Sequence, residues 1–319
     1  MDVCQSAVQV NPEDVAGVRF AVSPLLEVVT SYRVVQSRST AVFAPWWERR
    51  GEVARQLGGS HLRFLVKSGA YVPDFLTPKP QAPVECFADE LTRLLETPHA
   101  QVREELRQIV SPTDRGLFDR YLKDTGGTLG ALAEELTRYW QAVIEPDWPH
   151  LRAVLEADVL YRSRRLAQGG PATLLAELHP RVRYGAGHAW PRPDGQGLTL
   201  VPSVFAWPDG YMVYARESPF TFAYPARGTA ELWGPWPAPP APLSELMGET
   251  AARLLLALAE PRTTTGLSAL LGSSVSGVSP HLHRLKALGL ATSTRQGKRV
   301  WYEWTQRGQA LTRLFQEQP

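Results

Sequence analysis

The spacing of apolar residues divides the chain into a helical part, a strand-rich part and a second helical part. Up to about residue 167 the apolar positions recur at helical spacing, and each such segment stops at Pro or Gly. Ser23 and Pro24 are the predicted N-cap and first residue of the first helix, which follows a strand at 18–22. Further predicted helices cover 45–57, 85–96, 99–110, 113–123, 128–144 and 148–167.

After residue 176 the pattern changes to short strands separated by turns that contain Gly, Pro or Asp. The four predicted strands are rich in aromatic residues and lie within 181–190, 197–207, 210–215 and 220–226. Short strands that follow one another in this way favour a small antiparallel β-meander packed on the preceding helices. We therefore expect an α+β fold for the first part of the chain.

A proline-rich segment indicates where that first part ends. Five prolines fall between residues 233 and 242, and such a run is semi-rigid and interrupts regular helix or sheet. The predicted organisation is an N-terminal α+β domain for regulation or dimerisation at 1–233, a linker at 234–242 and a second domain at 243–319.

The second domain is predicted to be a winged helix-turn-helix. Helices are expected at 243–259 and 263–272, and a third runs from the cap Ser274 to about residue 288. Two strands at 291–295 and 298–304 then form a hairpin around a Gln-Gly turn, and a last helix covers 308–315. Helix, helix, turn, helix and hairpin is the order of elements in that class of DNA-binding domain.

The third helix and the hairpin carry side chains suited to DNA. Val278, Leu282, Leu285 and Leu288 are spaced to face the core, so the polar residues of the helix are turned outward. Small hydroxyl side chains at a helix start allow close approach to the major groove, and basic residues at a hairpin tip suit phosphates. The predicted DNA-binding residues are Ser274, Ser276, Gly277, Ser279, His283, Lys286, Arg295, Lys298 and Arg299.

The charge distribution favours the same partner. Residues 243–319 contain nine Lys and Arg against five Asp and Glu, whereas the rest of the chain has 25 basic and 27 acidic residues. Positive charge gathered in a small C-terminal domain points to a polyanion. The alternative is a winged helix that serves only as a protein-interaction module, without direct DNA readout.

We also predict a homodimer. One winged helix covers only a few base pairs, whereas two copies on a two-fold axis match a palindromic operator in double-stranded DNA. The last helix has an apolar stripe that provides a predicted dimer surface, formed by Leu311, Leu314 and Phe315.

Residues 260–308 resemble the ArsR-type winged-helix transcriptional regulators. The shared pattern is Pro-Arg-Thr, LG, V-S-x-H-L, L-x-x-x-G-L and G-[KR]-x-V-x-Y, within EPRTTTGLSALLGSSVSGVSPHLHRLKALGLATSTRQGKRVWYEWTQRG. Segments such as VRFAVSPLLEVV, GAYVPDFLTPKP and LEADVLYRSRRLAQGG are similar to a bacterial subgroup with a long N-terminal domain of unassigned role. The resemblance implies a transcriptional regulator. We expect it to be a repressor, and we expect the long domain to sense an effector or mediate dimerisation.

The chain departs from that family at two points. Pro280 lies inside the third helix, where the family has a helix former, so we expect the helix to be kinked or to begin one turn later. The metal-sensing members place cysteines on this helix and acidic or His ligands on the last one. Residues 275–288 contain no Cys and residues 308–319 contain no His or Asp, so metal sensing of that type is not supported.

The remaining chemistry of the chain is sparse. Cys4 and Cys86 belong to no metal-ligand pattern, and together with the absence of a long apolar run or a secretory signal they favour a cytoplasmic protein without a membrane partner. No nucleophile stands with a base and no phosphate-binding loop occurs, so we expect no enzymatic activity, no cofactor and no metal.

Two further features bear on the N-terminal domain. The adjacent acid pairs Glu104–Glu105 and Glu134–Glu135 are predicted to lie on solvated helix faces. Trp46 and Trp47 either line a pocket for a small apolar effector or belong to the core, and the sequence leaves both interpretations open.

Overall fold

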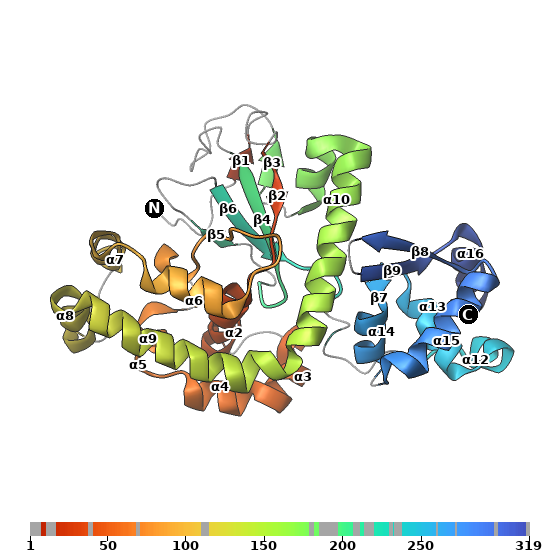
Figure 1. Ribbon diagram of the computed structural model, residues 1–319, viewed down its shortest axis with the longest axis horizontal. Coiled ribbons are helices and arrows are strands. Elements are labelled where there is room, and N and C mark those ends of the chain that lie inside the picture. The colour runs from red at the N-terminus through yellow and green to blue at the C-terminus, as the bar shows by residue number, and fades with distance from the viewer. Residues whose placement is uncertain are drawn as a thin grey trace. The chain divides into compact units, whose positions relative to one another are not determined.

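A computed structural model of the chain describes most of its 319 residues, in two compact units. Unit 1 comprises Met1–Asp147 and Arg164–Arg227, and unit 2 comprises Trp148–Ser163 and Gly228–Pro319 (Figure 1). The described residues are 8–10, 17–37, 41–67, 71–109, 115–178, 182–184, 197–206, 211–213, 220–229, 232, 238–259, 261–271, 273–296 and 299–316.

Unit 1 is mainly helical and confirms most of the predicted helical segments. Its first long helix begins at Pro24, directly after Ser23, whose hydroxyl accepts a hydrogen bond from the Leu26 amide at 3.0 Å. The segment at 60–65 is a helix that the periodicity did not predict. The helices are α2 (Pro24–Ser37), η2 (Ala41–Phe43), α3 (Ala44–Trp46), η3 (Trp47–Gly51), α4 (Glu52–Leu57), α5 (Ser60–Leu65), η4 (Asp74–Leu76), α6 (Phe87–Leu95), α7 (His99–Leu106), α8 (Arg115–Lys123), α9 (Thr125–Tyr139), η5 (Trp140–Ile144) and η6 (Glu145–Asp147).

The sheet of unit 1 is not the antiparallel meander that the sequence predicted. Its strand order is β2-β4-β6-β5, in which β2, β4 and β6 run parallel and only β5 pairs antiparallel with β6. The strands are β2 (Arg19–Phe20), β4 (Leu198–Ser203), β5 (Tyr211–Val213) and β6 (Phe220–Pro225); β1 (Val8–Val10) pairs separately and in parallel with β3 (Val182–Tyr184).

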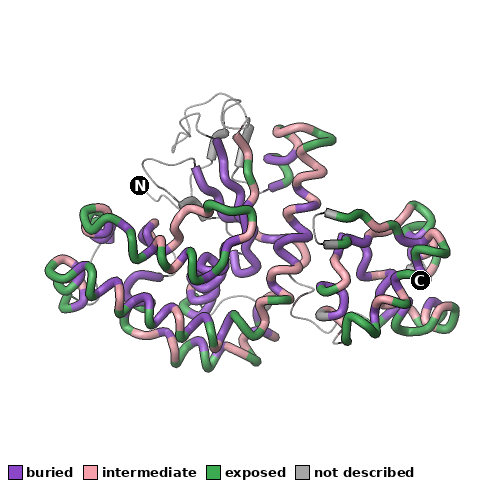
Figure 2. Tube along the Cα trace, viewed as in Figure 1, coloured by how far each residue is buried: buried purple, intermediate pink, exposed green. Residues whose placement is uncertain are grey.

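Burial explains why this part of the prediction was wrong. All six residues of β4 and the first five of β6 are buried, as is typical of parallel strands that are covered on both faces (Figure 2). Leu174, Leu175 and Leu178 pack against Leu200 and Phe222. The turn residues between the strands predicted that each strand pairs with the next one in the chain. In the structure β5 lies at the edge of the sheet, so β4 pairs with β6 instead.

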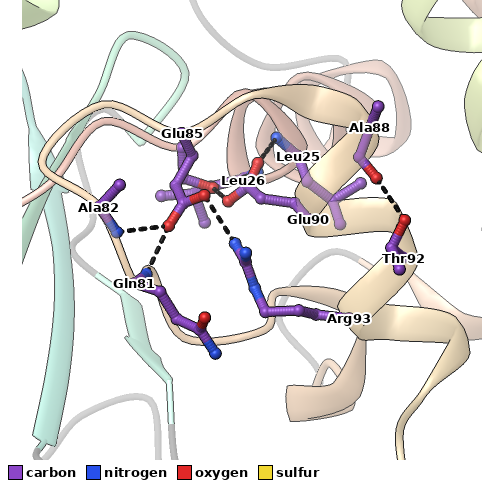
Figure 3. A network of polar contacts seen from close by, with 10 residues as sticks. Leu25, Leu26, Gln81, Ala82, Glu85, Ala88, Glu90, Thr92 and Arg93 are labelled. Carbon is purple, nitrogen blue, oxygen red and sulfur yellow. Dashed lines mark hydrogen bonds and ion pairs between the residues drawn. The ribbon is translucent and has the colours of Figure 1, made fainter.

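Buried carboxylates connect distant segments of unit 1. The Glu90 side chain of α6 accepts hydrogen bonds from the Leu25 amide at 2.7 Å and from the Ser23 hydroxyl at 2.5 Å, at the start of α2 (Figure 3). Glu85 accepts from the Gln81 and Ala82 amides and lies 2.8 Å from Nη2 of Arg93. Both acids therefore satisfy backbone groups that have no partner within a helix or sheet.

The two acid pairs predicted to be solvated are each divided between surface and interior. Glu104 and Glu134 are exposed, whereas Glu105 and Glu135 are buried. Glu105 accepts from the Phe75 amide at 2.9 Å. The prediction failed for the second member of each pair because adjacent helical positions point about 100° apart, so one side chain can face inward while its neighbour faces water.

Glu135 completes the N-terminus of α5. Its two carboxylate oxygens accept from the Leu62 amide at 2.7 Å and from the His61 amide at 3.2 Å. The helix is preceded by Gly59, which supplies no capping side chain, and a Cβ at Gly59 would collide with the Glu135 carboxylate. The acid from α9 therefore replaces a local cap.

Unit 2 begins with the first half of a long helix. Helix α10 (Trp148–Leu178) includes Gly170 at φ 70° followed by Pro171, so it consists of two helical segments joined at the predicted Gly-Gly-Pro break. The other elements are α12 (Ala241–Met247), α13 (Glu249–Ala257), β7 (Arg262–Thr263), α14 (Thr264–Leu270), α15 (Val275–Ala287), β8 (Ala291–Gln296), β9 (Arg299–Trp304) and α16 (Gln306–Gln316).

The single helix predicted at 243–259 is in fact two. Gly248 has φ 86°, which ends α12 and begins α13. The three-stranded antiparallel sheet of the unit has the order β7-β9-β8. Its main core joins α13, α14, α15 and the sheet through Leu255, Leu267, Leu282 and Tyr302.

The first half of α10 packs on this unit. Ala157 and Leu160 bury Trp301 of β9, and a Cβ at Gly266 of α14 would lie 3.0 Å from Cβ of Ala153. Unit 2 thus contains a segment outside the predicted range 243–319. The predicted domain boundaries remain a prediction.

Candidate nucleic-acid interface

Helix α15 begins where the sequence predicts, at a serine cap. The Ser274 hydroxyl accepts a hydrogen bond from the Gly277 amide at 3.1 Å and lies 2.9 Å from the Ser276 hydroxyl. The first turn is open to solvent, because Ser274, Val275, Ser276 and Gly277 are all exposed. A helix N-terminus with exposed amides and small side chains favours the approach of an anion such as a phosphate.

The two faces of α15 differ as their spacing predicts. Val278, Leu282 and Leu285 are buried in the core of unit 2. Leu288, which was expected beside them, is half exposed at 50%, because it follows the last helical turn and Gly289 then redirects the chain at φ 66°. The prediction for Leu288 was wrong.

The opposite face is polar and contains no acid. His283 is exposed, Ser279 is half-buried, and the sequence of α15 has neither Asp nor Glu. Arg284, which is also exposed, was not among the predicted DNA-binding residues. Its spacing could have predicted it, because Arg284 lies four residues after Pro280, on the outward face of the helix and near its basic end.

Pro280 does not delay the helix. Helix α15 extends from Val275 through Pro280 to Ala287, so the predicted alternative that it begins one turn later is wrong. Pro280 is exposed. It therefore removes one backbone donor at the solvent face of the helix, where water can hydrate the Ser276 carbonyl.

Lys286 connects the helix to the hairpin. Its Nζ donates to the Ser293 hydroxyl of β8 at 2.7 Å, and both groups lie at the surface. Arg295, farther along β8, is exposed. Lys286 and Arg295 are thus brought to adjacent, solvent-facing elements.

The hairpin tip is only partly described. Gln296 pairs with Arg299 at the end of the β8–β9 ladder. Lys298 and the side chain of Arg299 lie outside the described residues.

The charge of this region is strongly positive. Residues 273–316 contain seven Lys and Arg and only one acid, Glu303. Arg284, Lys286 and Arg295 are all exposed, whereas Glu303 is half-buried. A surface of this composition attracts a polyanion.

The predicted dimer residues occupy three different environments. Leu311 packs against the core of unit 2, Phe315 is half-buried and Leu314 is 70% exposed. Helix α16 lies against α12, where Leu246 is 62% exposed. Leu246 and Leu314 are thus exposed leucines on two helices that contact each other.

A metal-ion cluster and a membrane-spanning helix are both absent from the described part of the chain. No group of three or more His, Cys, Asp or Glu side chains is placed to hold a metal ion there. No helix within the described ranges has both the length and the apolar character needed to cross a membrane. Comparisons with protein-family models, with curated proteins and with solved structures each returned no match for this chain.

Proposed function

We propose that this protein is a sequence-specific DNA-binding transcriptional regulator, a repressor that acts as a homodimer. In this proposal unit 2 contains a winged helix-turn-helix, with α14 and α15 as the helix pair and β8–β9 as the wing. The order of elements in unit 2 and its β7-β9-β8 sheet support this assignment.

The observation that carries the proposal is the outward face of α15. It combines an exposed, capped N-terminal turn with His283 and Arg284, and no acid interrupts it. A recognition helix contacts base edges with its N-terminal residues and with residues one and two turns later. Ser276, Ser279 and His283 have this spacing.

The hairpin has a different role in the proposal. Arg295, Lys298 and Arg299 flank or form its tip, where they would contact phosphates on either strand of an operator. Phosphate contacts position the protein on DNA but carry no sequence information. Helix α15 would read the sequence, and the wing would add affinity.

A two-fold axis would place two copies of α15 one helical turn of DNA apart, or a multiple of it. The exposed Leu246 and Leu314 on adjacent helices support a second copy of the chain as the partner.

Fluorescence-anisotropy titrations with random and selected DNA test both roles. Lys298→Ala with Arg299→Ala should weaken binding to all sequences alike, and each lost phosphate contact should lower the log–log salt slope by about 0.9. Alanine at Ser276, Ser279 or His283 should cost about 1–3 kcal/mol on the selected site and little on random DNA.

Arg253→Ala is the control, since Arg253 lies on α13 and its Nη2 is 2.7 Å from Glu249. An unchanged salt slope in the hairpin variant would contradict the wing assignment. Wild-type protein that binds no DNA at low salt would favour the protein-interaction module instead.

A further inference from the structure

Unit 1 has a small surface pocket, whose lining includes no residue of the proposed DNA-binding elements. Its volume is about 170 Å³, and its lining comes from α2, the η3 turn, α4 and α5. Tyr32 and Val35 are buried, and Trp47 is half-buried. The lining residues are Tyr32, Val35, Gln36, Trp47, Arg55 and Arg63.

Two glycines make room for the aromatic walls. A Cβ at Gly51 would lie 2.5 Å from Cδ2 of Trp47, and a Cβ at Gly58 would collide with the Tyr32 ring. Trp47 also opens the π-helical turn η3, which ends at Gly51. Single π turns are uncommon and occur frequently at functional sites.

The two neighbouring tryptophans have different roles. Trp46 is 1% exposed and packs edge-on against Phe205 with ring centroids 4.9 Å apart, so it belongs to the core. Trp47 lines the pocket. Of the two interpretations that the sequence left open, the core applies to Trp46 and a pocket wall to Trp47.

The polar groups of the pocket are directed by contacts with one another. Nε2 of Gln36 donates to the Tyr32 hydroxyl at 2.8 Å, and the Arg63 side chain also hydrogen-bonds that hydroxyl. Nη2 of Arg63 lies 3.4 Å from the Gly58 carbonyl. A guanidinium has five N–H donors, so Arg63 retains donors for a ligand.

The acids near the pocket are already engaged. Both carboxylate oxygens of Glu52 accept from Nη2 of Arg55 at 2.8 Å. Glu135, whose charge interacts with Arg63, accepts from the His61 and Leu62 amides. Because Arg55 is paired with Glu52 and the Glu135 carboxylate accepts from backbone amides, Arg63 is the cation best placed to bind a further negative group.

We propose that this pocket binds a small aromatic carboxylate, with its ring against Trp47 and its carboxylate on Arg63. The size agrees, because an apolar cavity of about 150 Å³ in another protein accommodates benzene. An arginine fork matches a planar carboxylate, and an indole face matches a planar ring. This inference does not rest on the proposed DNA binding, and its test contains no DNA.

Benzoate is the probe, and the full-length protein is titrated by saturation-transfer NMR and calorimetry. Benzamide has the same shape without the charge, and benzylammonium reverses the charge. Benzoate should bind with a Kd of about 1 mM or tighter, and the two other probes at least about tenfold more weakly.

Variants assign the contacts. Arg63→Gln should weaken benzoate at least about tenfold and leave benzamide unchanged, whereas Trp47→Leu should weaken both aromatic probes. Arg138→Gln is the control, since Arg138 is exposed on α9 and does not line the pocket. Circular dichroism confirms that each variant is folded.

Three results would overturn the inference. The first is wild-type protein that fails to bind benzoate at about 10 mM, well above the expected Kd. The second is equal affinity for benzoate and benzamide. The third is a folded Arg63→Gln variant that binds benzoate as the wild type does.

Discussion

Glu27→Gln tests whether a buried carboxyl makes unit 1 more stable in mild acid. Glu27 lies on α2 with none of its surface exposed, and each of its carboxylate oxygens is 3.2 Å from the Val204 amide. The Ser203 hydroxyl, which lies 3.1 Å from that of Thr30, also hydrogen-bonds the carboxylate. Gln retains the shape and one acceptor but cannot titrate.

The sign follows from the pKa. Burial raises the pKa of Glu27 from 4.5 to about 8, and hydrogen bonds from Ser203 and Val204 offset only part of that rise. The folded state therefore binds this proton more tightly than the unfolded state. The resulting stabilisation is complete below pH 4.5 and is lost as the pH rises through 8. Between pH 8 and pH 5, this carboxyl alone should add about 3–4 kcal/mol to the free energy of unfolding.

Urea unfolding of both proteins, followed by circular dichroism at several pH values from 5 to 8, measures this contribution. Burial raises the pKa of Glu90 to about 8 as well, but Glu90 contributes equally to both proteins and cancels in the comparison. The expected result is a difference between wild type and Glu27→Gln that grows by about 3–4 kcal/mol as the pH falls from 8 to 5.

Glu52→Gln is the control. Glu52 is exposed, and hydrogen bonds from Arg55 and Gln56 lower its pKa, so it titrates below the range of the experiment. Its curve should parallel that of the wild type. Parallel curves for Glu27→Gln as well would refute the assignment of a raised pKa to this buried carboxyl.

Two further predictions concern contacts within each unit. Glu135→Ala removes the acceptor of the His61 and Leu62 amides and should lower the free energy of unfolding by about 2–4 kcal/mol. Glu134→Ala is the control, because Glu134 is exposed at the neighbouring position. In the same denaturation assay it should change the free energy of unfolding by less than about 0.5 kcal/mol. A fragment of residues 243–319 lacks the α10 residues that bury Trp301, so it should bind an apolar dye and aggregate. Fusing residues 148–163 to this fragment through a flexible linker should reduce both dye binding and aggregation. A soluble fragment that binds no dye would contradict this role of α10.

Much of unit 2 could be predicted from the sequence because its signals are local. The Ser274 cap, the buried positions Val278, Leu282 and Leu285 and the hairpin after Gly289 each depend on residues within a few turns of one another. Local signals also revealed the exposed polar face of α15, on which the proposed DNA binding depends. They failed at 243–259, where apolar spacing continues across Gly248 although the chain bends there.

The arrangement of unit 1 could not be predicted in the same way. Three of its features join residues that lie far apart in the chain. They are the parallel pairing of β4 with β6, the hydrogen bond from the Val204 amide to the Glu27 carboxylate, and the cap that Glu135 provides for α5. The pocket beside Trp47 likewise needs α2 and α5 to meet around Gly58. Periodicity shows which face of a segment is apolar, but which faces meet is decided by burial and hydrogen bonding across the whole fold. The amino-acid pattern by itself thus determined most of the helices, the hairpin and the exposed face of α15, whereas tertiary packing alone decided the strand order, the buried acids and the pocket.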